Sequence, residues 1–398
     1  RPRSITDNGW YPSYRFHQPD LERKLRARLK DFKKISIMQN TKVIGLKENK
    51  NSVKIILENV NDKKIQEVTS KYIVGCDGAN STIRKQIKSK FQNLGFTQKW
   101  AVIDLILKKD KKELPDRTIQ YSNSKRPATY CRNVGKRRRW EFAIHNSESE
   151  KQVLSNSYIW KFLKPWLKPR DAYMERKTIY TFQSAISKRW RRGRVFLAGD
   201  AAHLMPPFMG QGMCAGIRDV SNLAWKISYC LKNNHNEKLL NTYQSERYSN
   251  VKEYIKTTAK MGEFVNAIGT SNITGEVSST PDGKKSMRSI KPKLGKGLGS
   301  VKDKNRGKIF PQFNINYTKS LDVKFSLKPI LILSKEIKKN ISKKINSVQP
   351  QKNKNLEKFF ENSNSKAVIV RPDRFILSSC KSVKDFKSYL ARNLFFLT

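Results

Sequence analysis

Several features that would place a chain in a familiar class are missing from this sequence. No apolar run approaches the roughly 20 residues that a helix needs to cross a bilayer. The opening segment, RPRSITDNGWYPSYRFH, has neither the apolar stretch nor the cleavage site of a signal peptide. We therefore predict a chain with no membrane segment that begins within a longer protein and resides in the cytoplasm.

Cysteine and histidine are scarce. The five cysteines form no CxxC pair, and an odd number favours reduced thiols over a disulfide framework. The four histidines, His17, His145, His203 and His235, have no metal-ligand spacing. The sequence therefore predicts no metal site.

Acidic residues are also few, 33 against 82 lysines and arginines, which gives a net charge of +49. Such an excess raises the possibility of a nucleic-acid or other polyanion-binding protein. The basic residues, however, run through every segment alongside abundant Asn and Ile, which also fits a lysine-biased coding sequence. We expect nonspecific polyanion binding in either case.

At 398 residues the chain is long enough for two or three domains. Hydrophobic periodicity predicts helices and strands in a mixed order. We expect helices over 18–32, 212–231 and 237–267, strands over 41–46 and 52–60 joined by a hairpin turn, buried strands over 72–76 and 194–199, alternating strands from 93 to 184, a strand over 367–372 and a final helix over 382–393.

The most informative segment is GRVFLAGDAAHLMPPFMGQGMCAGIRDVSNLAWKI, residues 193–227. A strand that ends in Asp200 can offer its carboxylate to a ligand hydroxyl. Gly210 and Gly212 let backbone N–H groups approach a ligand, and the helix after them favours negative charge. The alternative is an ordinary strand–turn–helix. The aspartate, the proline pair and the Gly-Gln-Gly run in fixed order favour a flavin site.

A second segment, YIVGCDGANSTIRKQI (72–87), is a strand followed by Asp77, Gly78, a turn of small residues and Arg84. Alone, such a turn is more often a helix cap than a site. Beside a bound dinucleotide, the same residues are candidates to contact pyrophosphate and ribose, with Arg84 fixing the geometry. Because both motifs occur in one chain, each is a more specific indication of a cofactor site.

With these motifs, the chain resembles the class A flavoprotein aromatic monooxygenases of the p-hydroxybenzoate hydroxylase type. Several runs resemble its 3-(3-hydroxyphenyl)propionate/3-hydroxycinnamate hydroxylase subgroup. They are FHQPDLERKL (16–25), KRPATY (125–130), RRRWEF (137–142), the segment 200–227, TYQSER (242–247), FPQ (310–312) and VRPD (370–373).

The resemblance implies a set of cofactor-binding residues. In the family, residues equivalent to Asp77 and Gly78 serve both FAD and NAD(P)H, and Arg84 is implied to fix that loop. Gln18 is implied to contact the flavin, and Gly199 and Asp200 to bind its ribityl chain. The flavin ring is implied to lie beside the turn shaped by Pro206 and Pro207 and to be bordered by Gly210, Gln211, Gly212 and Met213.

It also implies a fold and its domains. We expect an α/β chain with a three-layer, glutathione-reductase-like FAD-binding fold, a substrate-binding sheet domain and a small thioredoxin-like domain without a CxxC. The expected boundaries are 1–92 and 185–269 for the FAD-binding domain, 93–184 for the substrate sheet, 270–305 for a linker and 306–398 for the thioredoxin-like domain.

The implied reaction is hydroxylation of a phenolic aromatic acid, with FAD, NADH or NADPH, and O2, through a flavin C4a-hydroperoxide. No catalytic acid or base can be assigned, since His203 is more often a structural residue in such a turn. Arg126 or Arg138 is a candidate to steer a substrate carboxylate. A homodimer is possible, and a polyketide-like substrate is an alternative within the class.

One departure from the family stands out. No strand followed by Gly-x-Gly-x-x-Gly and a helix occurs in the sequence, so we expect the first βαβ unit of the fold to be missing. We accordingly predict an incomplete fragment that alone binds FAD poorly or not at all. The alternative function is a basic polyanion- or nucleic-acid-binding protein on a relic flavoprotein scaffold.

Overall fold

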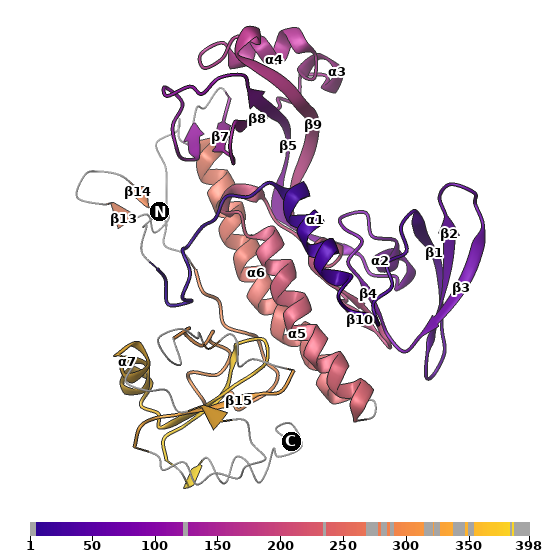
Figure 1. Ribbon diagram of the computed structural model, residues 1–398, viewed down its shortest axis with the longest axis vertical. Helices are drawn as coiled ribbons and strands as arrows, with labels where there is room; N and C mark the ends of the chain where they lie inside the picture. Colours follow the sequence, from indigo (N-terminus) through magenta and orange to yellow (C-terminus); the bar gives the residue numbers. More distant parts are fainter. Residues whose placement is uncertain are drawn as a thin grey trace.

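The structure is a computed structural model that describes residues 5–121, 126–233, 236–267, 278–279, 285–286, 290–313, 321, 327–336, 347–348, 354–382 and 384–385. A strand-rich part, a pair of long helices and a C-terminal part follow one another from top to bottom in Figure 1. Among these residues, no helix combines the length and apolar character needed to cross a bilayer.

Two small sheets lie to one side of the helix pair (Figure 1). The first is antiparallel and contains β1 (Thr41–Glu48), β2 (Val53–Asn59) and β3 (Ile65–Ser70). In the second, β4 (Ile73–Gly75) runs parallel to β11 (Val195–Leu197), which pairs antiparallel with β10 (Arg191–Arg192). Helix α1 (Gln18–Leu29) precedes these sheets, and α2 (Thr82–Gln86) follows β4.

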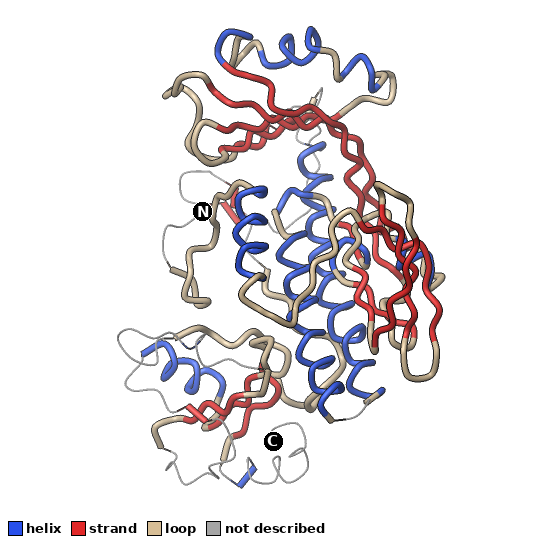
Figure 2. Tube along the Cα trace, turned by 45° about the vertical axis from the view of Figure 1, so that its right-hand side comes forward, coloured by secondary structure: helices blue, strands red, loops and turns tan. Residues whose placement is uncertain are grey.

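A larger antiparallel sheet has six strands in the order β12-β9-β5-β8-β7-β6. They are β5 (Phe91–Leu107), β6 (Ile119–Tyr121), β7 (Ala128–Arg132), β8 (Arg137–Ala143), β9 (Ala172–Ser187) and β12 (His203–Leu204). The long strands β5 and β9 run from this sheet down toward the small sheets, as Figure 2 shows.

Alternation along β5 gives this sheet two different faces. Ala101, Ile103 and Leu105 point into an apolar core with α3 (Glu150–Val153) and α4 (Asn156–Leu163). Trp100 points the other way, where its ring lies 5.7 Å from that of Phe208. Because residues two apart in a strand share a face, Val102 and Asp104 lie on the Trp100 side. The second face is the one that meets the candidate site.

Helices α5 (Gly212–Lys232) and α6 (Glu237–Ala267) form the centre of the molecule. Their apolar side chains share one core with β11 and α2. The start of α5 packs closely on the turn after β11, since a Cβ at Gly216 would lie only 3.3 Å from the Cα of Gly199. A larger side chain at Gly216 would separate the helix from that turn.

The C-terminal part has a four-stranded sheet in the order β16-β15-β17-β18. Its elements are β15 (Ile330–Leu333), β16 (Ser347–Val348), α7 (Lys354–Ser363), β17 (Ala367–Val370) and β18 (Ile376–Cys380), while β13 (Ser278–Ser279) and β14 (Lys285–Ser286) form a separate pair. β15 and β17 are buried throughout, so the sheet has an apolar core of its own.

A buried ionic cluster fastens this C-terminal part to the helix pair. Arg371 donates to both carboxylate oxygens of Glu246 at 2.9 and 2.8 Å, and it also bonds Asp373. Lys226 donates to Glu246 and Asn222 at 2.8 Å each. All five side chains are buried. Burial would raise the pKa of Glu246, but Arg371 and Lys226 hold it well below its usual range.

Most of the helices and strands expected from the sequence are present. The helices begin and end within three residues of the predicted limits, and β1 and β2 form the predicted hairpin. The prediction of a buried strand over 72–76 was wrong in one respect, because Val74 in the middle of β4 is 37% exposed. Within the described part of the chain, β4 pairs with β11 alone, so one of its edges is open. Much of the 270–305 linker and of the 382–393 helix lies outside the described residues.

Candidate functional site

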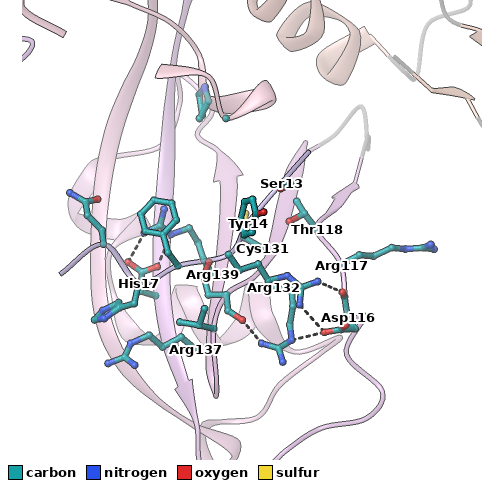
Figure 3. A pocket seen from close by; sticks show the side chains of 18 of the residues that line it. Ser13, Tyr14, His17, Asp116, Arg117, Thr118, Cys131, Arg132, Arg137 and Arg139 are labelled. Atoms are coloured by element: carbon teal, nitrogen blue, oxygen red, sulfur yellow. Dashed lines mark hydrogen bonds and ion pairs between the residues drawn. The ribbon is translucent and has the colours of Figure 1, made fainter. Parts of the chain in front are cut away.

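A cavity of about 1790 Å³ lies between the N-terminal segment, the second face of the large sheet and the turn before α5 (Figure 3). This volume exceeds the roughly 300–1,000 Å³ typical of a pocket for one small molecule. Among its lining residues are Gln18, Pro207 and Gly210, which the sequence assigned to one cofactor site. The other residues assigned to that site do not line this cavity: Asp77, Gly78, Arg84, Gly199, Asp200, Pro206, Gln211, Gly212 and Met213. The structure therefore brings together residues that are far apart in the sequence.

The turn before α5 leaves room for a ligand. It consists of a short 3-10 helix, Pro207–Met209, that ends at Gly210 with φ +63°, a left-handed conformation that favours glycine. A Cβ at Gly210 would meet no atom within 4 Å. No side chain caps the start of α5, so its first N–H groups and the positive end of its dipole are left for an anionic or carbonyl group.

The Gly-Asp turn after β11 is held from behind by Asp219 of α5. One carboxylate oxygen of Asp219 accepts the N–H of Gly199 at 3.0 Å and lies 2.6 Å from Nε2 of His203. The other accepts Nε of Arg247 at 2.8 Å. Burial alone would raise the pKa of Asp219, but His203 and Arg247 lower it to about 2. Asp219 is therefore ionised and fixes both ends of the turn.

Asp200 itself, inside that turn, remains exposed and has no hydrogen-bond partner among the described residues. The pKa of Asp200 is raised above its ordinary value, mainly by partial desolvation; the nearby His203 opposes this shift and the charge of Asp219 adds to it. A carboxylate held in place but unpaired is suited to accept hydrogen bonds from ligand hydroxyl groups.

Arg84 links the two sequence motifs directly. Its guanidinium donates to the carbonyl of Ala201 at 3.1 Å and to that of Ala79 at 2.7 Å. The same group lies over the ring of Phe91, 3.8 Å from its centroid. Arg84 is 7% exposed, so it positions the loops around both motifs. The assignment of Arg84 to the cofactor-binding residues stays a prediction.

The loop after β4 is ordered by Asp77. This carboxylate accepts the hydroxyl of Ser81 at 2.5 Å and the N–H of Ile83 at 3.1 Å, and Ser81 in turn caps α2. Gly78 has φ +78° with open space where a Cβ would stand. The loop thus has the helix-capping geometry that was the alternative to a cofactor contact, and the two roles are compatible.

The arginines proposed to steer a substrate lie elsewhere. Arg126 makes a two-pronged ion pair with Glu148 at 2.6 and 3.1 Å, and Arg138 is buried with bonds to backbone carbonyls. Neither lines the cavity, whereas Arg137 and Arg139 of the same strand do. Along β8 the side chains alternate between the two faces, so Arg138 points away from the face that carries its neighbours.

Comparison with known proteins places the chain in a family. Residues 3–258 match the family described as "FAD binding domain", and the chain belongs to it. It is 31% identical over 309 residues to a probable NADH-specific resorcinol 4-hydroxylase of Rhodococcus jostii, covering 76% of this chain and 57% of that protein. It is 30% identical over 263 residues to a 3-(3-hydroxy-phenyl)propionate/3-hydroxycinnamic acid hydroxylase of Burkholderia cenocepacia, covering 66% and 48%. The chain spans about half the length of the curated relatives it matches.

Solved structures share the mixed α/β fold of this chain. Aklavinone-11 hydroxylase in a ternary complex with FAD and aklavinone superposes with a TM-score of 0.78 and 17% identity, over 96% of this chain and 78% of that one. The anhydrotetracycline hydroxylase OxyS from Streptomyces rimosus gives a TM-score of 0.72 at 17% identity, over 96% and 79%. The resemblance to flavin-dependent aromatic hydroxylases that the motifs indicated is thereby confirmed.

The residues present fit one half of an FAD molecule. The open space at Gly210, the uncapped start of α5 and the unpaired Asp200 suit an isoalloxazine ring and its ribityl chain. No segment of the sequence supplies the strand–Gly-x-Gly-x-x-Gly–helix unit that binds the pyrophosphate in dinucleotide folds.

Proposed function

We propose that this chain is the flavin- and substrate-facing part of an FAD-dependent aromatic hydroxylase. The reaction is hydroxylation of a phenolic aromatic acid such as 3-(3-hydroxyphenyl)propionate. One atom of O2 enters the ring as a hydroxyl group, the other leaves as water, and NADH or NADPH supplies two electrons. The supporting observation is the cavity in which Gln18, Pro207 and Gly210 meet the polar face of the large sheet.

Each group has a distinct task in this proposal. Bound flavin supplies the redox chemistry and the activation of O2. Asp200 accepts hydrogen bonds from the ribityl hydroxyls, while Gly210, Gln211, Gly212 and Met213 border the ring. Trp100 and Phe208, whose rings lie 5.7 Å apart, limit water at the inner end of the cavity.

The finer features of the chain belong to the same proposal. We infer a glutathione-reductase-like FAD domain formed by 1–92 and 185–269, a substrate sheet over 93–184, a linker over 270–305 and a thioredoxin-like domain over 306–398. A cytoplasmic location and a homodimer are proposed on the resemblance alone. A larger substrate, such as the aklavinone of one solved neighbour, is a second candidate that the cavity volume of about 1790 Å³ favours.

The first experiment is a flavin titration of this chain with FAD and with FMN, followed by fluorescence quenching. Because the described residues fit only the ring and ribityl half of FAD, we expect weak binding with closely similar affinity for the two flavins. A version to which a strand–Gly-x-Gly-x-x-Gly–helix unit has been added before residue 1 is expected to prefer FAD. Strong selection of FAD over FMN by this chain alone would contradict the half-site assignment.

The second experiment measures NADH and NADPH oxidation by the flavin-loaded protein, with product analysis for 3-(3-hydroxyphenyl)propionate and for resorcinol. A hydroxylated product and substrate-stimulated oxidation support the proposal. If no version binds flavin, the motifs are relics and the polyanion-binding alternative becomes the one to test. Retention on heparin that survives at high salt would then favour it.

A further inference from the structure

The wall of the cavity carries an excess of positive charge. Its lining includes six arginines against four carboxylates among the described residues, His17 aside. Figure 3 shows Arg132, Arg137 and Arg139 together in this wall, with Asp116 bonded beside them. The arginines are Arg15, Arg117, Arg132, Arg137, Arg139 and Arg176, and the carboxylates are Glu22, Asp104, Asp116 and Glu175.

Three of these residues form a ladder across neighbouring strands. In the sheet register, Asp104 of β5 stands opposite Arg139 of β8 on one side and Arg176 of β9 on the other. Arg139 donates to the two oxygens of Asp104 at 2.6 and 3.1 Å, and Nε of Arg176 donates to one of them at 2.9 Å. Two guanidinium groups therefore share one carboxylate, which leaves one positive charge unbalanced.

The ladder is held rigidly and is still accessible. The Asp104 side chain is 12% exposed, whereas those of Arg139 and Arg176 are 33% and 44% exposed. Burial would raise the pKa of Asp104, but its bonds to Arg139 and Arg176 hold it below the ordinary value, so the carboxylate stays charged. Side chains anchored on strands are placed more accurately than those on loops.

Glu141, the other carboxylate beside Arg139, does not cancel the positive charge of the ladder below neutral pH. Glu141 lies two residues along β8 from Arg139, with 3.7 Å between the charged groups. Burial raises the pKa of Glu141 to about 7, and Glu141 is not among the cavity-lining residues.

The position of the ladder matches the outer end of a small aromatic ligand. Trp100, which contacts Phe208 of the flavin-side turn, lies four residues before Asp104 on the same face of β5. At the rise of a β-strand this separation is about 13 Å. A phenyl ring with a short acidic side chain is shorter than this backbone separation, and the long side chains of Arg139 and Arg176 can span the remainder.

We propose that Arg139 and Arg176, held by Asp104, bind the carboxylate of an aromatic acid whose ring points toward the Pro207–Gly210 turn. The proposal rests on the proposed function and sharpens it, because it separates acidic phenols from neutral phenols such as resorcinol. Guanidinium pairs are well suited to a carboxylate, with planar donor pairs that match its two oxygens.

The test is equilibrium binding, without turnover, of 3-(3-hydroxyphenyl)propionate and of its carboxamide. Arg176→Gln removes the unbalanced charge, yet Arg139 still pairs with Asp104, so the fold is kept. We expect the acid to bind about tenfold more tightly than the amide, and we expect Arg176→Gln to abolish that difference by weakening the acid alone. Arg176→Lys should restore part of it.

The matched control is Arg170→Gln, which removes the same charge from an exposed residue outside the cavity lining. Equal affinity for acid and amide, no binding of either, or equal losses in the Arg170 and Arg176 variants would overturn the proposal. Acid binding that depends on Arg176, without any hydroxylated product from the flavin-loaded protein, would leave the binding site intact and reject the proposed activity.

Discussion

The carboxylate of Asp219 lies 2.6 Å from Nε2 of His203, and neither side chain is more than 1% exposed to solvent. The same carboxylate also accepts the N–H of Gly199 and Nε of Arg247. A single charge on α5 thus holds the turn that presents Asp200. The arrangement explains how an exposed aspartate keeps one position without a partner of its own.

Replacing Asp219 by Asn is expected to destabilise the fold by about 3–5 kcal/mol, because Arg247 would remain buried with its main charge partner removed. Urea unfolding measures this loss. Glu67→Gln, which breaks an exposed pair with Lys54, is the matched control and should cost less than about 1 kcal/mol. Similar losses in the two variants would show that Asp219 does not carry the turn.

Asp219 also makes a prediction for acid stability. Its pKa is about 2 in the folded chain against 3.8 as the ordinary value. A carboxylate whose folded pKa is lowered contributes stability that is fully present above the ordinary value and is lost as the pH falls toward the folded one. Asp219→Asn should therefore flatten the decline of the unfolding midpoint between about pH 4 and 2.

The pKa of Glu141 is shifted in the opposite direction to that of Asp219. Burial raises its pKa from 4.5 to about 7, so the folded chain binds a proton that the unfolded chain releases. Its contribution is present below about pH 4.5 and falls as the pH rises through 7. Glu141→Gln should remove that decline and stabilise the protein by about 3 kcal/mol at pH 8 relative to the parent chain. Parallel pH profiles of the two unfolding midpoints would contradict the assignment.

The ionic cluster around Glu246 predicts how the C-terminal part is attached. Arg371→Met removes the guanidinium that pairs with both Glu246 and Asp373, so these two buried carboxylates lose the positive partner that they share. We expect a loss of about 3–5 kcal/mol and faster proteolysis between the helix pair and the C-terminal sheet. Lys366→Met, which breaks an exposed pair with Glu336, should change neither measurement appreciably.

Gly210 separates a strain effect from a ligand effect. Gly210→Ala forces a side chain into a left-handed conformation and projects a Cβ into the cavity, whereas Gly135→Ala creates the same strain at φ +57° outside the cavity lining. Both should cost about 1–2 kcal/mol of stability. Flavin titration should show an affinity loss of about tenfold for Gly210→Ala alone. Unchanged flavin affinity in Gly210→Ala would remove this turn from the proposed site.

The sequence predicted those features that depend on nearby residues. The strand, turn and helix from 193 to 231 follow from periodicity and from glycine and proline at fixed positions, and they form β11, the turn and α5. Gln18, Pro207 and Gly210 were assigned to one site, and they line one cavity. Such elements can be predicted because they depend on residues that are close together in the sequence.

The features that the sequence did not predict depend on contacts between residues that are far apart in the sequence. Asp104, Arg139 and Arg176 become neighbours only through the register of three strands, and no local pattern specifies that register. Asp219 lies within the helix expected over 212–231, and no local pattern marks its role, because its partners His203 and Arg247 come from a turn and from another helix. The exposure of Val74 was missed because an apolar strand gives no sign of whether its edge will be covered.

The bond from Arg84 to Ala201 joins residues 117 positions apart. The segment between them contains β5 to β9, five of the six strands of the large sheet. Pairing of Phe91 with Ser187 in the sheet shortens the loop that this bond has to close, so we expect the two motif loops to come together only after the sheet has formed. A chain arrested before that step would keep most of its strands and yet have no place for a flavin, which would make cofactor uptake a direct report on the completion of folding.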